Sequence, residues 1–369
     1  MGESWLVTDP AAEAGSIETL PPLEGWTVVT RADLAASGVA FGPEARVAIT
    51  TEAAMPEVLR RLDPDRGEAI ETLKDKVAFR TALRDRYPDL DVRDVTLDQL
   101  PSLTIADGSR YVIKPARGVF GTAVHEVHKS TDLAALRDRI SAEVARGAEV
   151  LSASALSGDT LIVEPYIEGE EYAVDAVYTM EGDPIIVGAY RHPMPHNPAY
   201  LHVVYHAGAD VLSDVYDQAL AFYRHLGATL DLHGMAMHGE FRLGPSGQLV
   251  PIEVNSMRVG GMGLGNMLYH TAGIDAFHHF RAGTLPDWSP VREDDHLHVF
   301  LVAYNGATVD TATHRPDWDA LRGHFDDIVL EVPFDHRRQL AFGVLYARQR
   351  PERLHELLAL EFDGLFVAE

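Results

Sequence analysis

The residues of this chain whose types and spacing most directly suggest chemistry are Glu240, Glu253 and Asn255. Two carboxylates held close together repel each other unless a cation lies between them. Carboxylate and amide oxygens, with no imidazole or thiolate required, are the ligands that suit Mg²⁺ beside substrate phosphates. Taken alone, two acids on neighbouring strands can also be the solvated polar face of an ordinary hairpin, so the surrounding motifs decide between the two interpretations.

A β-hairpin is the element that would position these three side chains. Two runs of alternating apolar residues, 238–243 and 249–254, flank a turn-forming Gly-Pro-Ser-Gly segment. Alternation places Glu253 and Asn255 on the same face of the second strand. With the turn centred in that segment, Glu253 becomes the diagonal neighbour of Glu240, and their Cα atoms are expected to be roughly 7–8 Å apart.

A second chemical feature is Lys114, which ends an expected strand at 111–114. The loop 115–121 follows at once, and Gly118 and Gly121 would let backbone N–H groups approach phosphate oxygens while the lysine supplies a point charge. A lysine at the end of an edge strand is commonly exposed to solvent instead. The chain contains no Walker A spacing and no G-x-G-x-x-G motif, so this loop is a weak signal by itself.

A third feature is the acidic segment from Glu164 to Glu171, which joins two expected strands at 161–167 and 172–178. In a chain this acidic, a surface loop is the simplest interpretation of such a segment. The irregular stretch 190–202, rich in His and Pro, follows the second strand. Irregular segments on a rigid scaffold often carry recognition residues.

Composition limits the class of protein. The chain has 369 residues, 46% of them hydrophobic, which is ample for two or three domains. The absence of cysteine excludes disulfides, thiolate metal sites and cysteine nucleophiles. A net charge of -25 argues against nucleic acid as a partner. Because the sequence shows no secretory leader and no apolar run of about 18 residues or more, we expect a cytoplasmic protein without a membrane partner.

Apolar periodicity outlines the remaining elements. Residues 1–70 alternate short apolar runs with helical segments and predict a small α/β unit. Charged and apolar residues at helical spacing predict one helix over 65–86, which includes Lys76 and ends before Pro88. After residue 289 the order βαββαβ is typical of a ferredoxin-like domain.

Taken in order, residues 70–275 resemble the ATP-grasp family of ligases. In that family an acid is followed thirteen residues later by a Glu-x-Asn unit, as Glu240 is by Glu253 and Asn255, and these residues bind Mg²⁺. The resemblance therefore implies ATP as a cofactor with two Mg²⁺ ions, or Mn²⁺. The residues at the family's nucleotide-binding positions are Lys76, Lys114, Gly118 and Gly121 for the phosphates, Glu164, Tyr166 and Ile167 for adenine, and Glu171 for ribose.

Three further residues take their roles from the same resemblance. Many family members carry an arginine two residues after the asparagine, whereas Arg258 comes three residues after Asn255. The resemblance assigns Arg258, together with Lys114, to catalysis at the γ-phosphate and the acyl phosphate in spite of this shift. In related ligases a basic residue after the corresponding strand faces the acyl donor, so Arg191 is the first candidate for that role and His202 the second.

The motifs resemble those of carboxylate–amine ligases, such as the L-amino-acid ligases, more than those of carboxylases. In such ligases a carboxylate attacks the γ-phosphate of ATP to give an acyl phosphate and ADP, and an amine then displaces phosphate. The glycine-bearing loop would act as the lid that excludes water. Small-molecule carboxylates and amines would be the partners, and a homodimer is compatible with the resemblance. The alternatives are a non-amine acceptor, a carboxylase, and a nucleotide-binding regulator that performs no chemistry.

The expected fold class combines α/β and α+β domains. It is an ATP-grasp fold whose two α+β lobes clasp ATP, with a short N-terminal α/β domain and a C-terminal βαββαβ extension. The expected boundaries are an N-terminal domain at 1–70, a small lobe at 71–165, a large lobe at 166–288 and a C-terminal domain at 289–369.

Overall fold

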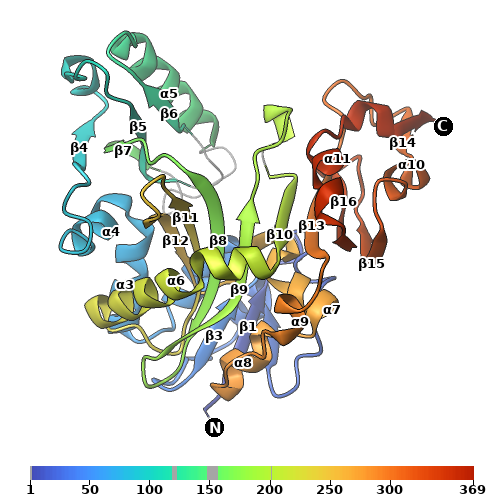
Figure 1. Ribbon diagram of the computed structural model, residues 1–369. Coiled ribbons are helices and arrows are strands. Elements are labelled where there is room, and N and C mark those ends of the chain that lie inside the picture. Colours follow the sequence, from blue (N-terminus) through green and yellow to red (C-terminus); the bar gives the residue numbers. More distant parts are fainter. Residues whose placement is uncertain (1, 119–122, 148–156, 201) are drawn as a thin grey trace. The chain divides into compact units, whose positions relative to one another are not determined.

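The computed structural model describes residues 2–118, 123–147, 157–200 and 202–369 (Figure 1). By their contacts the residues form two compact units. The smaller unit is Pro64–Glu168, and the larger unit combines Met1–Asp63 with Gly169–Glu369.

The larger unit begins with a parallel three-stranded sheet. Strands β1 (Ser4–Thr8), β2 (Thr27–Thr30) and β3 (Arg46–Ile49) lie in the order β2-β1-β3. Helix α1 (Arg31–Ala36) joins β2 to β3, and α2 (Met55–Leu59) follows β3. Parallel strands linked through a helix are the arrangement of an α/β unit, as the sequence predicts for this region.

The main element of the larger unit is an antiparallel eight-stranded sheet in the order β12-β11-β8-β9-β10-β13-β16-β15. Its strands are β8 (Glu170–Tyr178), β9 (Pro184–His192), β10 (Val204–Ala207), β11 (Ala236–Leu243), β12 (Leu249–Ser256), β13 (Leu297–Tyr304), β15 (Asp327–Pro333) and β16 (Ala341–Gln349). The predicted hairpin is β11 with β12, at one edge of this sheet.

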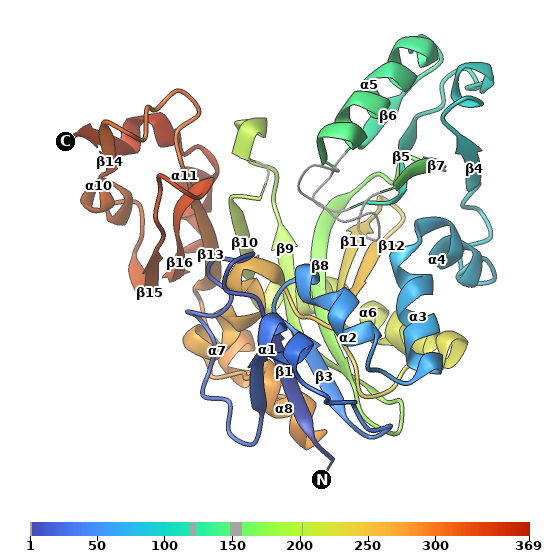
Figure 2. The same cartoon turned by 180° about the vertical axis from the view of Figure 1, so that it is seen from behind.

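Different elements cover the two faces of this sheet. Helix α6 (Ala209–Leu230) crosses β8 and β9 on one face (Figure 1), and its Phe222 packs edge-on against Phe241 of β11. On the other face, which we call the distal face, β1, β3 and α8 (Ala276–Ala282) share a core with β8, β9 and β11 (Figure 2). Because side chains alternate along a strand, each residue of β8, β9 and β11 belongs either to the α6 face or to the distal face.

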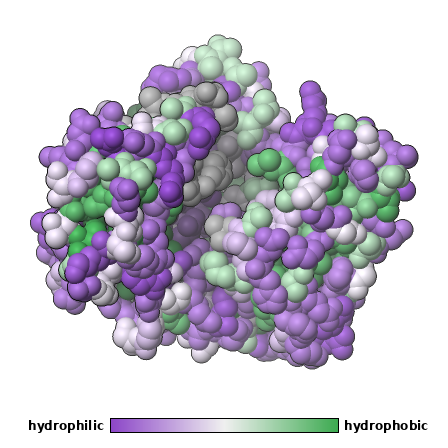
Figure 3. Space-filling view, turned by 90° about the horizontal axis from the view of Figure 1, so that it is seen from above, coloured by the Kyte–Doolittle hydropathy of each residue, from purple (hydrophilic) through white to green (hydrophobic). Residues whose placement is uncertain are grey.

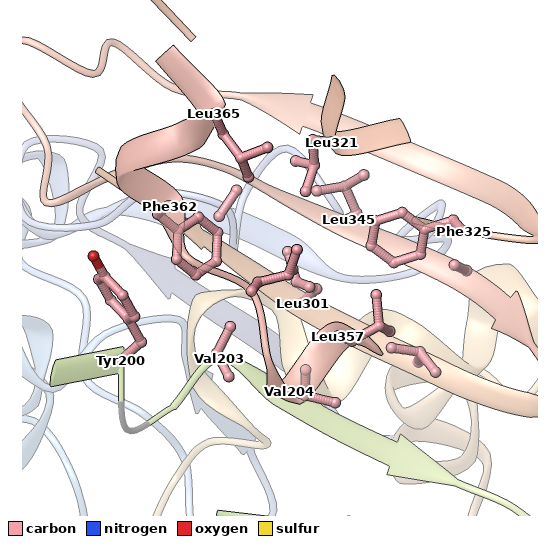
Figure 4. Close-up of a cluster of buried hydrophobic side chains, with 14 of the residues drawn as sticks. Tyr200, Val203, Val204, Leu301, Leu321, Phe325, Leu345, Leu357, Phe362 and Leu365 are labelled. Carbon is pink, nitrogen blue, oxygen red and sulfur yellow. The ribbon is translucent and has the colours of Figure 1, made fainter. Parts of the chain in front are cut away.

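The C-terminal segment extends the large sheet through β13, β16 and β15. Strand β14 (His314–Pro316) pairs with β17 (Phe366–Ala368) in a separate two-stranded sheet. The short helices here are α7 (Met267–Ala272), α9 (Ser289–Arg292), α10 (Trp318–Arg322) and α11 (Leu354–Leu358). Figure 4 shows the core of this region, in which Tyr200 and Val204 pack with Leu301, Leu345 and Phe362.

The order of strands and helices expected after residue 289 is present, with β14 added. The segment does not form the self-contained sheet of a ferredoxin-like domain, in which the last strand lies beside the first. Strand β10 occupies that edge of β13, and β17 pairs with β14 instead. The division of the larger unit into an N-terminal domain, a large lobe and a C-terminal domain stays a prediction.

The smaller unit contains a four-stranded antiparallel sheet in the order β4-β7-β5-β6. Its described strands are β4 (Arg93–Thr96), β5 (Tyr111–Arg117), β6 (His125–Val127) and β7 (Ser157–Pro165). Helix α5 (Leu133–Gly147) buries Leu136 and Ile140 in one core with Ile113 and Leu161 of the sheet.

The single helix expected over 65–86 is two helices, so that prediction is wrong. Helices α3 (Pro64–Lys74) and α4 (Lys76–Ala82) are separated by Asp75, whose backbone is extended. The Asp75 carboxylate accepts hydrogen bonds from the backbone N–H groups of the first turn of α4, at 3.0 Å each. An aspartate in the N-cap position favours the start of a new helix, and its extended backbone separates that helix from α3. Lys76 is therefore the first residue of α4.

Hydrophilic residues predominate on the face drawn in Figure 3, where apolar residues form small scattered patches. This distribution agrees with the net charge of -25. Among the described helices, none combines the length and the apolar character needed to cross a membrane.

Candidate functional site

Strands β11 and β12 bring the three predicted metal ligands together on the distal face. Glu240 lies directly across from Glu253, and His238 lies directly across from Asn255. A β-bulge between Glu240 and Phe241 shifts the register by one residue from that of a regular hairpin. The expected diagonal placement of the two acids is therefore wrong, and they are direct neighbours, which brings their charges closer together.

The electrostatics of this acid pair favour a bound cation. The pKa of Glu240 is raised to about 7, first because burial removes water from its carboxyl group and second because Glu253 carries a like charge. The Glu240 side chain nevertheless keeps 32% of its surface exposed, so a ligand can reach it. Asn255 donates a hydrogen bond from Nδ2 to Glu253 Oε1 at 3.2 Å. Its amide oxygen is then a further candidate metal ligand beside the acids. This donor set fits Mg²⁺ or Mn²⁺.

A histidine and an aspartate, neither of which the sequence singled out, lie in the same group. His238 Nδ1 is 2.7 Å from Asp175 Oδ1, and His238 Nε2 is 3.9 Å from Glu240 Oε1. Asp175 is fully buried, and His238 is 4% exposed. Alternation along β11 could have placed His238 beside Glu240, but Asp175 comes from β8, 63 residues earlier in the chain.

Arg258 follows β12 after a sharp turn at Met257. Met257 has a left-handed backbone (φ 66°), and its carbonyl accepts a hydrogen bond from Ile49 N–H of β3 at 2.8 Å. Arg258 Nη2 lies 3.6 Å from Glu52 Oε1, and the charge of Arg258 acts to lower the pKa of Glu240. The turn thus accommodates the additional residue before the arginine and keeps its charge within reach of the acid pair.

Glu171, the residue expected at the ribose, also lies on the distal face. Its Oε1 is 2.8 Å from His192 Nδ1, and its Oε2 accepts a hydrogen bond from Arg242 Nη2 at 3.2 Å. Burial alone would raise the pKa of Glu171, but its interactions with His192 and Arg242 outweigh burial and lower the pKa. Glu171 is therefore a charged and well-oriented hydrogen-bond acceptor.

His202 belongs to an aromatic stack beside Glu171. The His192 ring stacks on Tyr205 at 4.1 Å and on His202 at 5.3 Å, and His202 Nδ1 lies 3.2 Å from the Tyr205 hydroxyl. Burial, followed by the charge of His192, lowers the pKa of His202. At neutral pH His202 therefore offers a hydrogen bond rather than a positive charge.

Arg191 lies on the α6 face, away from the acid pair. Its guanidinium is 2.5 Å from Asp214 and 3.6 Å from Asp210, both on α6, and stands 5.3 Å from the centre of the Tyr172 ring. The neighbouring residue His192 is the one that points to the distal face. The expectation that Arg191 faces an acyl donor beside the metal ligands therefore has no support in this geometry.

In the smaller unit, Lys114 and Glu164 form a buried ion pair. Lys114 Nζ lies 2.6 Å from Glu164 Oε1, and Arg80 Nε donates to Glu164 Oε2 at 2.7 Å. Burial would raise the pKa of Glu164, but the charges of Lys114 and Arg80 outweigh it and lower the pKa to about 2. Lys114 is 5% exposed, so it is not the solvated lysine of the alternative interpretation.

The other phosphate-binding candidates of the smaller unit surround the start of the loop. Lys76 Nζ donates to the carbonyl oxygen of Gly118 at 2.9 Å, so Lys76 and Gly118 are neighbours. Strand β5 continues to Arg117 rather than ending at Lys114 as expected, and Arg117, which the sequence did not single out, pairs with Glu71 at 2.7 Å. Gly121 lies outside the described residues.

Tyr166 and Ile167 follow the end of β7 and are half-buried. The backbone N–H of Tyr166 donates to the Arg110 carbonyl oxygen at 3.0 Å, and the Arg110 guanidinium lies 3.9 Å from the centre of the Tyr166 ring. This segment is therefore held in place by a backbone hydrogen bond and a ring contact with Arg110.

Residues 108–266 match the ATP-grasp domain family. No curated protein matches the sequence. The crystal structure of an L-amino acid ligase from Bacillus licheniformis superposes with a TM-score of 0.69 at 13% identity, over 100% of this chain and 98% of that chain.

Two other structures have the same fold. An ADP complex of N5-carboxyaminoimidazole ribonucleotide synthetase gives a TM-score of 0.65 at 13% identity, over 96% of each chain. The biotin carboxylase domain of Hydrogenobacter thermophilus 2-oxoglutarate carboxylase, solved with MgADP and bicarbonate, gives 0.60 at 14% identity, over 95% of this chain and 87% of that one. The family match places an ATP-grasp domain at residues 108–266, and the superpositions show that the chain has a multidomain ATP-grasp fold.

Proposed function

We propose that this protein is an ATP-dependent ligase that joins a small-molecule carboxylate to an amine and releases ADP and phosphate. The observation that carries the proposal is the direct pairing of Glu240 with Glu253, beside Asn255, on the distal face. Two acids placed face to face, with the pKa of Glu240 raised to about 7, form a site where a bound cation would relieve the repulsion between the carboxylates.

In the larger unit, Glu240, Glu253 and Asn255 would hold two Mg²⁺ ions, with Mn²⁺ as an acceptable replacement. The metal would supply charge neutralisation for the phosphates of ATP. Arg258 would add positive charge where the γ-phosphate and the acyl phosphate develop negative charge, and Glu171 would accept hydrogen bonds from the ribose hydroxyls. Its contacts with His192 and Arg242 already hold Glu171 in place for such a role.

In the smaller unit, Lys76 and Lys114 would bind phosphate oxygens together with Gly118 and Gly121. The buried Glu164 would orient Lys114 through their contact at 2.6 Å. Segment 165–167 would hold adenine through backbone groups, with Tyr166 fixed by Arg110. In phosphoryl transfer the protein acts mainly by positioning groups and stabilising charge, so these residues suffice without a protein nucleophile.

The acyl donor would lie near His202 rather than Arg191, because His202 shares the distal-face stack with His192 and Arg191 does not. A carboxylate would attack the γ-phosphorus of ATP, ADP would leave, and an amine nitrogen would then attack the acyl carbon and expel phosphate. The amine loses one proton in this step, and a base or solvent must accept it.

A carboxylase reaction is the second candidate, because a bicarbonate-bound carboxylase domain has the same fold over 95% of this chain. The test is phosphate release by the purified protein with Mg-ATP over a matrix of carboxylates and amines, including bicarbonate as one donor, followed by mass spectrometry of products. We expect release that needs one carboxylate and one amine together and yields a product with the mass of their amide. Release with bicarbonate alone would replace the amide-forming proposal by the carboxylase.

The third candidate, a regulator that binds nucleotide without turning it over, predicts ATP binding and no phosphate release with any pair. Glu253→Ala tests the metal site. It removes one acid from the pair and should abolish phosphate release while the protein stays folded. Turnover by this variant near the parent rate would contradict the assignment of the metal site.

A further inference from the structure

Three strands of the larger unit place a row of polar side chains next to the acid pair. His238 of β11 is directly across from Asp175 of β8 on one side and from Asn255 of β12 on the other. Glu240 and Glu253 form the neighbouring row. His238 is therefore one of four polar side chains at the corners of a square on the distal face, and the other three are the proposed metal ligands.

The contacts of His238 determine which of its nitrogen atoms faces this square. Nδ1 lies 2.7 Å from the carboxylate of Asp175, so Nδ1 carries the ring proton and donates a hydrogen bond to that oxygen. In the neutral ring the lone pair is then on Nε2, which is 3.9 Å from Glu240 Oε1. That distance is too long for a hydrogen bond. It is suitable for two atoms that share an ion between them.

The surroundings of Asp175 hold its carboxylate behind His238. It is fully buried, and the strand residue opposite it on β9 is Gly188. A Cβ atom at Gly188 would come within 2.3 Å of the Tyr190 hydroxyl. The absence of a side chain at position 188 thus makes room for the Tyr190 hydroxyl. Burial, followed by the negative charge of Asp175, raises the pKa of that hydroxyl. Such a carboxylate behind a histidine is the arrangement that fixes the orientation of metal-binding imidazoles.

A structural histidine would also be buried and hydrogen-bonded to an aspartate. Its second nitrogen would then point into the core or towards another hydrogen-bond partner. Nε2 of His238 instead faces a carboxylate beyond hydrogen-bond distance, on the face where the metal ligands converge. The geometry therefore favours a ligand over a core residue.

We propose that His238 Nε2 is a fourth protein ligand of the divalent-cation site, held in position by Asp175. The inference rests on the proposed function, because it concerns the cation assigned there to Glu240, Glu253 and Asn255. One imidazole among oxygen ligands shifts the preference of a site from Mg²⁺ towards Mn²⁺ and other transition metals, which accept nitrogen more readily. The protein should therefore bind Mn²⁺ more tightly than an all-oxygen site would.

The test is pulsed electron paramagnetic resonance of the full-length protein loaded with Mn²⁺ and a non-hydrolysable ATP analogue. A directly bound imidazole gives a ¹⁴N coupling on Mn²⁺, and labelling all histidines with ¹⁵N changes that coupling without any substitution. We expect the coupling in the parent protein and in H278Q, a matched control whose histidine is exposed on α8. We expect it to be lost in H238Q.

Titration of Mn²⁺ and Mg²⁺ gives a second readout that does not depend on activity. H238Q should lower Mn²⁺ affinity by about tenfold or more and Mg²⁺ affinity by less, and D175N should lower Mn²⁺ affinity by about tenfold because the imidazole loses its support. The ¹⁵N-labelling experiment on the parent protein keeps the inference testable if either variant fails to fold.

The outcomes separate this inference from the function on which it rests. If Mn²⁺ binds, E253A abolishes binding and the parent protein shows no nitrogen coupling, His238 is not a ligand although the metal site stands. If Mn²⁺ does not bind with or without the nucleotide analogue, both the metal site and the inference are wrong. If the coupling persists in H238Q, another histidine is the ligand and the assignment to His238 is wrong.

Discussion

At the scale of single residues, the direct opposition of Glu240 and Glu253 explains several properties at once. The β-bulge beside Glu240 brings the two carboxylates across from each other, and their repulsion adds to burial in raising the pKa of Glu240 to about 7. Such a pair is unfavourable in the metal-free protein. This repulsion is the electrostatic basis of the proposed cation site.

One prediction concerns the stability of the metal-free protein. Since the folded pKa of Glu240 lies above its ordinary value of 4.5, its ionisation destabilises the folded state as the pH rises through 7. Glu240→Gln removes that ionisation, so at pH 8 it should stabilise the metal-free protein by about 1–2 kcal/mol, allowing for the partial exposure of Glu240. Urea unfolding with and without Mg²⁺ measures both the gain and the expected loss of stabilisation by Mg²⁺.

The control for this variant is Glu181→Gln, an exposed acid in the β8–β9 turn. It should leave both the metal-free stability and the Mg²⁺ effect unchanged. If Glu240→Gln were stabilised by Mg²⁺ as strongly as the parent protein, Glu240 would not be a ligand.

A second prediction concerns the buried Lys114–Glu164–Arg80 group. The pKa of Glu164 is lowered to about 2, so the stability that its charge contributes is present above pH 4.5 and is lost as the pH falls from about 4.5 to 2. Glu164→Gln leaves two buried cations without their carboxylate and should destabilise the smaller unit by about 3–5 kcal/mol at pH 7. The deficit should shrink in acid, which urea unfolding at pH 7 and at pH 3 can measure.

Glu126→Gln provides the comparison within the same unit. Glu126 pairs with Arg110 at the surface, and such pairs contribute roughly 0–1 kcal/mol. Equal losses in the two variants would mean that burial does not strengthen the Glu164 pair.

At the scale of elements, the residue that caps α4 fixes the position of Lys76, which we propose to bind phosphate. Asp75 caps the helix that begins with Lys76, and Lys76 contacts the Gly118 carbonyl at the start of the glycine loop. The position of the lysine therefore depends on a cap one residue before it. The break between α3 and α4 is what directs Lys76 to the loop.

The corresponding prediction compares two helix caps of the smaller unit. Asp75→Ala should destabilise the protein by about 1 kcal/mol and should also weaken ATP binding several-fold, because Lys76 loses its fixed position. Asp132→Ala removes the equivalent cap of α5, where Asp132 accepts from Ala134 and Ala135 N–H, and should cost a similar amount of stability without changing ATP affinity. Calorimetric titration measures the ATP affinity of both variants. Equal losses of affinity in Asp75→Ala and Asp132→Ala would count against the role of Lys76.

At the scale of the whole molecule, the chain forms two units with separate cores. Ile113 belongs to the core of the smaller unit and Leu301 to the core of the C-terminal part of the larger unit, and both are fully buried. Truncating either residue to alanine should destabilise its own core by about 2–5 kcal/mol.

Hydrogen exchange measured by mass spectrometry tests this independence. Ile113→Ala should speed exchange in peptides from residues 64–168, and Leu301→Ala should speed it in peptides from the larger unit. Faster exchange throughout the chain in both variants would show that the two units unfold together, against the division seen in the contacts.

Much of the fold was accessible from the sequence because the informative patterns are local. Alternation and turn residues placed Glu253 and Asn255 on one strand of a hairpin, and the ATP-grasp architecture expected from the ordered motifs is confirmed. The place of Lys114 just before a glycine loop also follows from a short segment, whereas the helix start at Lys76 became visible only in the structure. The roles of these residues in binding stay predictions.

What only the tertiary structure decided depends on which strands become neighbours and on one-residue shifts. The bulge that makes Glu240 and Glu253 direct neighbours leaves no clear mark in the sequence, because one inserted residue changes the register while the apolar pattern still reads as a strand. The same sensitivity sends Arg191 to the α6 face and His192 to the distal face.

The pairing of Asp175 with His238 needs β8 beside β11, a contact between residues 63 positions apart that no local pattern encodes. Likewise, β13, β16 and β15 join the large sheet because β10 offers a free edge to β13, which the βαββαβ order alone could not reveal. Residue types and short spacings are therefore readable from the chain itself, since they act over one or two turns or strands. Register, sheet order and the facing of side chains are set by the packing of distant segments, and only the folded structure determines them.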